Sequence, residues 1–168
     1  PEVLAAISTE YSVELVYHLL IAEPKRGVDA FRDLGLRWHD QFDYSFADLN
    51  SLNRVIQEHI DAGRIKGRIL GWEKFFEGLV GSYKYEYDQT KIKFFEVIDG
   101  NYSDDKLNAD VRFRLGDVHT QLSEYAEART RYEEALPIYR AVTDKLGEAN
   151  CIKALGDVHT QLSEYAEA

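Results

Sequence analysis

Histidine has the widest chemical range of the residue types in this sequence, because it binds metals and acts as an acid or base near neutral pH. Two of the five histidines, His119 and His159, stand 40 residues apart in two identical stretches, LGDVHTQLSEYAEA at 115–128 and at 155–168. Equivalent positions in adjacent helical units lie about 10 Å apart, whereas a metal ion holds imidazole nitrogens at roughly 2.0–2.1 Å. We therefore expect both rings to pack between helices.

The other candidate chemical groups also favour structural roles. His39 and Asp40 are neighbours in sequence, and consecutive helical residues point about 100° apart, so they do not form a catalytic pair. Cys151 takes the place of Val111 in the repeat, which predicts a small buried side chain. The acidic segments at 43–48 and 103–105 lack the spacing of a calcium loop and are typical of helix N-termini. The sequence therefore predicts no enzyme, no metal site and no cofactor, although a helical enzyme in the N-terminal half stays open as a minor alternative.

Charge and composition limit the partners. The 168-residue chain carries 30 acidic and 20 basic residues, a formal net charge of −10, which disfavours nucleic acids and anionic membranes. One cysteine fits a reducing compartment, and we expect a cytoplasmic protein without a membrane span. The absence of methionine suggests that the chain is part of a longer one.

Helical periodicity explains the repeated stretch. Val111, Leu115, Val118 and Leu122 fall on one helix face. Ser123 then interrupts the pattern and is a candidate helix N-cap. A second apolar stripe follows: Tyr125, Ala128, Tyr132, Ala135 and Tyr139. Each unit is therefore predicted to be two antiparallel amphipathic helices.

The spacing of these residues resembles the tetratricopeptide repeat. Leu115-Gly116, a ring at His119, and the stripe from Tyr125 to Ala135 match that family's pattern of large and small residues. The 40-residue period is similar to the longer repeats of kinesin light chain and of Leu-Gly-Asn adaptors. The resemblance implies an all-α fold, a right-handed superhelical solenoid of helical hairpins.

Steps of about 40 residues extend the pattern towards the N-terminus. They place Phe75 with Trp72, and before them Leu34-Gly35 with Trp38, at family positions. They also align four tyrosines at the start of the second helix: Tyr44, Tyr85, Tyr125 and Tyr165. In this register Phe76 replaces the glycine and Asp88 the alanine, which predicts looser helix packing in the middle unit.

The predicted organisation follows from this register. Capping helices occupy 1–26, degenerate repeats 27–103, and 40-residue repeats 104–168, the last one truncated. An unrelated helical domain before the repeats is the alternative. The predicted helices span about 2–8, 10–22, 27–41, 45–62, 66–83, 89–98, 104–121, 124–142 and 146–161, with another from 164. Pro137 is expected to kink or weaken its helix.

The resemblance also implies a function. Repeats of this family bind a peptide or protein in a concave groove lined by the first helix of each unit. The matching positions are Phe113, Asp117, Thr120, Gln121, Lys153, Asp157, Thr160 and Gln161. The aspartates favour a basic partner and would repel the acidic chaperone tails that other members hold. Ordinary solvated surface is an equally weighted alternative for these positions.

Two further expectations concern the context of the array. Near-identical 40-residue repeats resemble the sensor arrays of STAND-type (NLR-like) signalling ATPases, so the chain is expected to be an adaptor or a sensor segment of a larger protein. The second copy stops inside a unit, so an adjoining segment or another molecule is expected to cover that end. The alternative function is therefore a scaffold that self-associates through its exposed C-terminal repeat.

Overall fold

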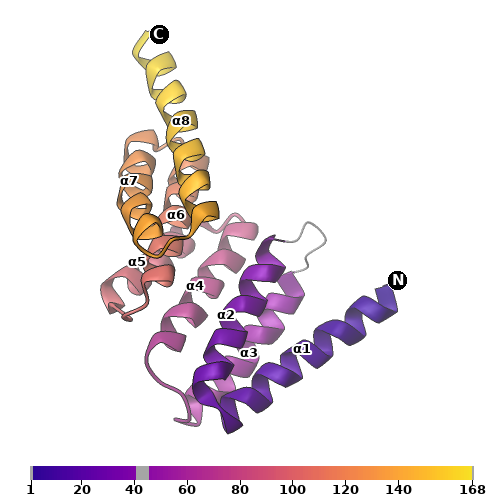
Figure 1. The fold of residues 1–168 in the computed structure, drawn as a ribbon. Coiled ribbons are helices and arrows are strands. Elements are labelled where there is room, and N and C mark those ends of the chain that lie inside the picture. The colour runs from indigo at the N-terminus through magenta and orange to yellow at the C-terminus, as the bar shows by residue number, and fades with distance from the viewer. Residues whose placement is uncertain (1, 41–45, 168) are drawn as a thin grey trace.

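The computed structural model describes residues 2–40 and 46–167, which form eight helices and no strand (Figure 1). Each helix packs against the next, and α2, α4, α6 and α8 form a series in which each contacts the following one. This arrangement confirms the predicted all-α solenoid of helical hairpins. The helices are α1 (Glu2–Ala22), α2 (Pro24–Asp40), α3 (Phe46–Asp61), α4 (Arg68–Tyr83), α5 (Tyr87–Gly100), α6 (Asp105–Gln121), α7 (Tyr125–Ala141) and α8 (Lys145–Glu167).

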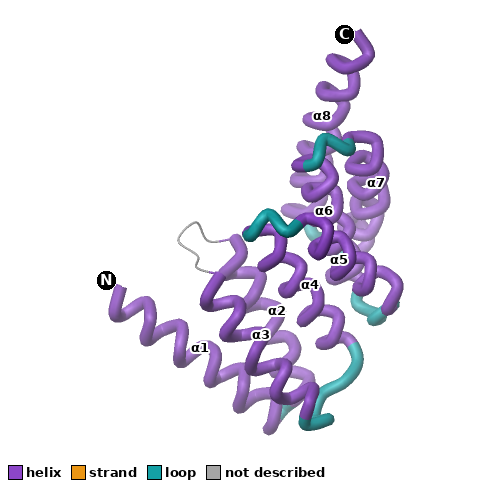
Figure 2. Tube along the Cα trace, turned by 180° about the vertical axis from the view of Figure 1, so that it is seen from behind, coloured by secondary structure: helices purple, strands orange, loops and turns teal. Residues whose placement is uncertain are grey.

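Short loops join most of these helices, with a longer one at 62–67 between α3 and α4 (Figure 2). Gly63 in this loop has φ +65°, a conformation that glycine adopts without strain. The loop after α5 begins at Asn101, with φ +44°. Both breaks lie where glycine and the Asp-Gly-Asn segment predicted them.

A continuous apolar core runs through α1 to α6, and two smaller clusters join α6, α7 and α8. Trp72, Phe75 and Phe76 are completely buried at its centre. Among the described residues, no helix is both long and apolar enough to span a membrane.

Close packing of α6 on α7 centres on a glycine and a tyrosine. A Cβ atom at Gly116 would lie 2.5 Å from the Tyr132 ring, and Ala128 is completely buried beside it. The two helices approach this closely only because these residues are small, as the repeat pattern predicted.

The same pairing corrects the predicted register of the middle unit. A Cβ atom at Gly78 would lie 2.4 Å from Phe94, so Gly78 and Phe94 are the counterparts of Gly116 and Tyr132. They precede them by 38 residues, not 40. The prediction that Phe76 replaces the glycine and loosens the unit is therefore wrong. Phe76 instead packs against Gly35 of α2, where a Cβ atom would lie 2.3 Å from its ring.

The predicted tyrosine alignment also changes. Tyr85 does not open a helix: it lies in the turn after α4 with φ +60° and is 78 % exposed. Tyr87 is the first residue of α5, as Tyr125 is of α7. The side chains of Tyr44 and Tyr165 lie outside the described residues, so their alignment stays a prediction.

The N-terminal helices differ from their predicted limits. One helix, α1, replaces the two predicted at 2–8 and 10–22. Pro24 is the first residue of α2, a position where a missing N–H costs nothing. The predicted domain limit at residue 26 therefore falls inside α2, and the proposed division of the chain into domains remains a prediction.

The two identical stretches adopt different structures. In the first, Leu122–Glu124 form a turn in which Ser123 has φ +60° and does not cap α7. In the second, α8 continues as one helix from Lys145 to Glu167, although a break before 164 was predicted. There Ser163 donates its hydroxyl hydrogen to the His159 carbonyl, 2.9 Å away. Pro137 also lies inside a continuing helix, since α7 extends to Ala141.

Candidate functional site

All eight predicted groove residues line one cavity between α6 and α8. Its volume is about 620 Å³. The α6 side chains Phe113, Asp117, Thr120 and Gln121 face the α8 side chains Lys153, Asp157, Thr160 and Gln161 across it. The neighbouring wall includes two tyrosines that the sequence did not assign to the groove, Tyr125 and Tyr132 of α7. Their presence follows from α7 packing over the end of α6.

Asp117 is already engaged within the protein. Its Oδ1 accepts a hydrogen bond from the Tyr132 hydroxyl at 2.9 Å, and its Oδ2 accepts one from Arg114 Nη1 at 3.2 Å. Thr120 Oγ1 lies 3.2 Å from the same tyrosine oxygen and donates to the Gly116 carbonyl at 2.9 Å. Although 37 % of the Asp117 side chain is exposed, burial of its carboxyl group raises the pKa, against the opposing effects of Arg114 and Tyr132. This aspartate therefore holds α7 on α6.

Asp157, its counterpart on α8, is exposed. It has no hydrogen bond or ion pair within the described part of the chain. Thr160 Oγ1 donates only to its own helix, at the Gly156 carbonyl 3.1 Å away, and Lys153 is exposed beside them. The groove thus has an occupied side on α6 and an accessible polar side on α8.

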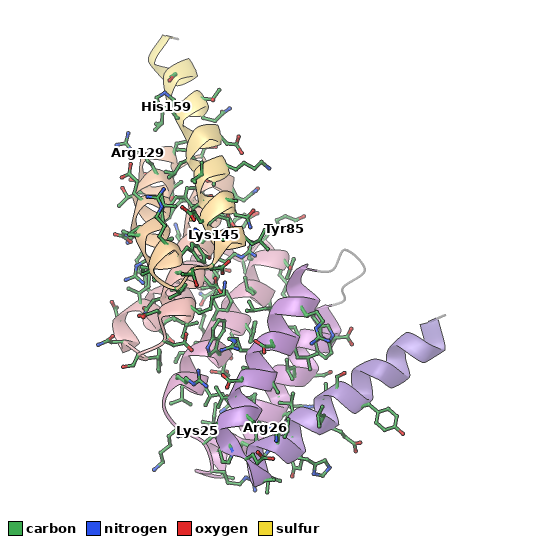
Figure 3. The ribbon with its side chains drawn as sticks, viewed as in Figure 1. Lys25, Arg26, Tyr85, Arg129, Lys145 and His159 are labelled. Atoms are coloured by element: carbon green, nitrogen blue, oxygen red, sulfur yellow. The ribbon has the colours of Figure 1, made fainter. Side chains whose placement is uncertain are left out.

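The histidines of the two copies differ in environment. His119 is buried, and its Nδ1 lies 2.5 Å from Glu124 Oε2 across the turn. This hydrogen bond, with the charge of Lys91, lowers the pKa of Glu124. His159 is exposed on the part of α8 that extends beyond α6 and α7 (Figure 3). The packing prediction is correct for His119 and wrong for His159, because the second copy has no turn and no covering helix. The side chains of His39 and Asp40 lie outside the described residues.

Cys151 is completely buried, as its repeat position predicted. Burial, followed by the charges of Asp117 and Asp110, raises the pKa of its thiol to about 12. A thiol in this state is a poor nucleophile at neutral pH. In the segments that the structure describes, no cluster of three His, Cys, Asp or Glu side chains could hold a metal ion.

Several buried polar contacts were not foreseen from the sequence. Trp72 Nε1 donates to Asp104 Oδ2 at 2.9 Å, while Oδ1 of the same aspartate caps α6 by accepting from the Leu107 N–H at 3.0 Å. Tyr139 donates to Asp110 at 2.7 Å. A helix N-cap was expected around 103–105, but its tryptophan partner is 32 residues away and carries no local signal.

The family comparison agrees with the geometry. The family model of the tetratricopeptide repeat matches residues 106–168, the segment that forms most of α6 and all of α7 and α8. Residues 106–168 therefore belong to the tetratricopeptide repeat family. Repeats of this family are generally protein–protein interaction modules and typically non-catalytic. A comparison with curated proteins returned no match. Membership of the 40-residue subclass stays a prediction.

Proposed function

We propose that the groove between α6 and α8 binds a peptide segment of a partner protein and that the chain is a non-enzymatic interaction module. The observation that carries the proposal is the convergence of all eight predicted positions on one cavity of about 620 Å³. Such repeat grooves suit an extended or helical segment because successive units present equivalent side chains in a row.

The groove chemistry favours a basic segment. Asp157 is an exposed carboxylate without a partner among the described residues, so it can pair with an arginine or lysine. Thr160 and Gln161 supply hydrogen bonds for a peptide backbone. Phe113 offers an apolar contact on the opposite wall. The net charge of −10 attracts the same class of partner over longer range.

The biological setting belongs to the same proposal. We place the module in the cytoplasm, as a scaffold or adaptor or as the sensor segment of a larger signalling protein. The support is the repeat resemblance and the near identity of the two copies, which is typical of such arrays. An adaptor needs only the groove, whereas a sensor would also transmit occupancy to another domain.

Selection from a random peptide library on the wild-type chain tests the groove. We expect the selected peptides to be enriched in arginine and lysine. Asp157→Lys should weaken their binding at least about tenfold, a loss of about 1.4 kcal/mol or more, in isothermal titration calorimetry. Asp157 is the better site to change because substitution of Asp117 would also release Tyr132.

Asp99→Lys is the matched control. Asp99 is exposed on α5 outside the groove, and its substitution makes the same change in net charge. If Asp99→Lys and Asp157→Lys weaken binding equally, only the overall charge matters and the groove is not the site. Selected peptides without basic residues would contradict the predicted partner chemistry.

A further inference from the structure

The identical stretches in α6 and α8 have opposite surroundings at their glycine. Gly116 is covered by Tyr132, whose ring would lie 2.5 Å from an added Cβ atom. Gly156 occupies the same position in the second copy, and no atom lies within 4 Å of a Cβ atom there. The residues that bind α7 in the first copy are thus repeated on α8 without a covering helix.

The difference extends along a whole helix face. The α6 side that contacts α7 consists of Lys106, Asp110, Phe113, Gly116, Asp117 and Thr120. The corresponding residues on α8 are all exposed, and we call them the α8 face: Leu146, Asn150, Lys153, Gly156, Asp157 and Thr160. Leu146 is 68 % exposed, which is unusual for a leucine beside so flat a helix surface.

The first helix presents the complementary problem. Tyr11, Glu14, Leu15 and His18 lie on one side of α1, are all exposed, and form what we call the α1 face. Tyr11 is 69 % and Leu15 59 % exposed. Figure 1 shows α1 and α8 at opposite ends of the array. The chain therefore carries two different uncovered helix faces, one at each end.

We propose that the α8 face of one molecule receives the α1 face of a second copy, so that the chains associate head to tail. Tyr11 then covers Gly156 as Tyr132 covers Gly116. Glu14 pairs with Lys153, and neither has a hydrogen bond or ion pair within the described part of its own chain. In place of Phe113, Lys153 supplies the charge that an acidic helix needs. Because the two faces differ, each added copy leaves one of each free, and the assembly grows without closing.

Two substitutions block the two ends separately. Leu15→Glu puts a charge on the α1 face, and Gly156→Gln fills the α8 face with a side chain that its own fold has room for. We expect the wild-type mass, measured by analytical ultracentrifugation over a concentration series, to rise beyond that of a dimer. Each variant alone should sediment as a monomer. An equimolar mixture should form a 1:1 dimer and nothing larger, since one good α1 face and one good α8 face remain.

Tyr85→Glu is the matched control, because Tyr85 is an exposed aromatic residue that points away from both faces (Figure 3); it should associate like the wild type. A wild-type chain that stays monomeric up to about 1 mM, where even a weak contact of about −4 kcal/mol would show, would overturn the proposal. So would a wild type that stops at dimers, or a Leu15→Glu variant that still associates by itself. This association is independent of the groove: Leu15→Glu should bind the selected basic peptides with unchanged affinity, so either proposal can fail alone.

Discussion

Alanine at Gly116 and at Gly156 should change stability in opposite directions, although fourteen residues around the two glycines are identical. Both glycines lie inside helices, where alanine is favoured by about 0.8–1.0 kcal/mol. At Gly156 the new methyl group meets no atom within 4 Å, so this gain remains. The variant is expected to unfold with about 0.5–1 kcal/mol more free energy than the wild type.

At Gly116 the same methyl group would lie 2.5, 2.7 and 2.9 Å from three carbons of the Tyr132 ring. Ordinary carbon contacts are about 3.5–4.0 Å, so the ring must retreat by roughly 1 Å. Its hydroxyl is held by Asp117 and its face by Phe113, whose ring centroid is 5.4 Å away. Overpacking of this kind costs about 1–3 kcal/mol. Because the helix propensity gain is common to both sites, the two variants should differ by that cost.

Urea denaturation followed by circular dichroism measures both free energies, in dilute protein so that association does not contribute. A second measurement isolates the cause: in a Tyr132→Ala background, Gly116→Ala should lose its penalty, because the clash partner is gone. Equal free-energy changes at the two glycines would refute the claim that α7 covers one and nothing covers the other.

Two other substitutions test single contacts. Tyr132→Phe removes the hydrogen bond to Asp117 and should lower the free energy of unfolding by about 1–2 kcal/mol in the same urea assay; Tyr125→Phe on the groove wall is the comparison, and an equal loss there would show that the Asp117 bond is not special. Glu73 is buried, and burial with the neighbouring Glu77 charge raises the pKa of its carboxyl group from 4.5 to about 7. The folded state then holds a proton that the unfolded state releases, so Glu73 stabilises the fold below pH 4.5 relative to higher pH, and this contribution is lost as the pH rises to about 7. Glu73→Gln should therefore gain stability relative to the wild type between pH 5 and pH 8, by on the order of 1–3 kcal/mol, and a gap that does not widen over this range would contradict the raised pKa.

The C-terminal half was predictable because its repetition supplies an internal alignment. Positions such as Val111 and Cys151 could be compared directly, and both are buried in the structure. The groove residues followed from the same register. Their individual roles did not, since only the placement of Tyr132 shows that Asp117 is engaged and Asp157 is accessible.

The middle unit was assigned incorrectly because a fixed step of 40 residues was carried through it. Its turn and its glycine–aromatic pair are both displaced by 38. The sequence does contain a signal for this: Gly78 and Phe94 have the same spacing as Gly116 and Tyr132. A close helix approach needs both members of the pair at once, so their spacing is a stronger guide than the period of tyrosines, which also occur in exposed turns.

The end of the repeated stretch shows how far local sequence determines structure. A positive φ at a serine costs about 1–2 kcal/mol, which Ser123 bears where the chain turns between α6 and α7. Packing offsets that cost, since the turn lets Tyr132 cover Gly116 and Ala128 become completely buried. Around Ser163 no following helix packs on the α8 face, so nothing offsets the cost and the helix continues. The same fourteen residues therefore form a turn only where a second helix rewards it, and the cover over Gly116, rather than the serine, decides where α6 ends.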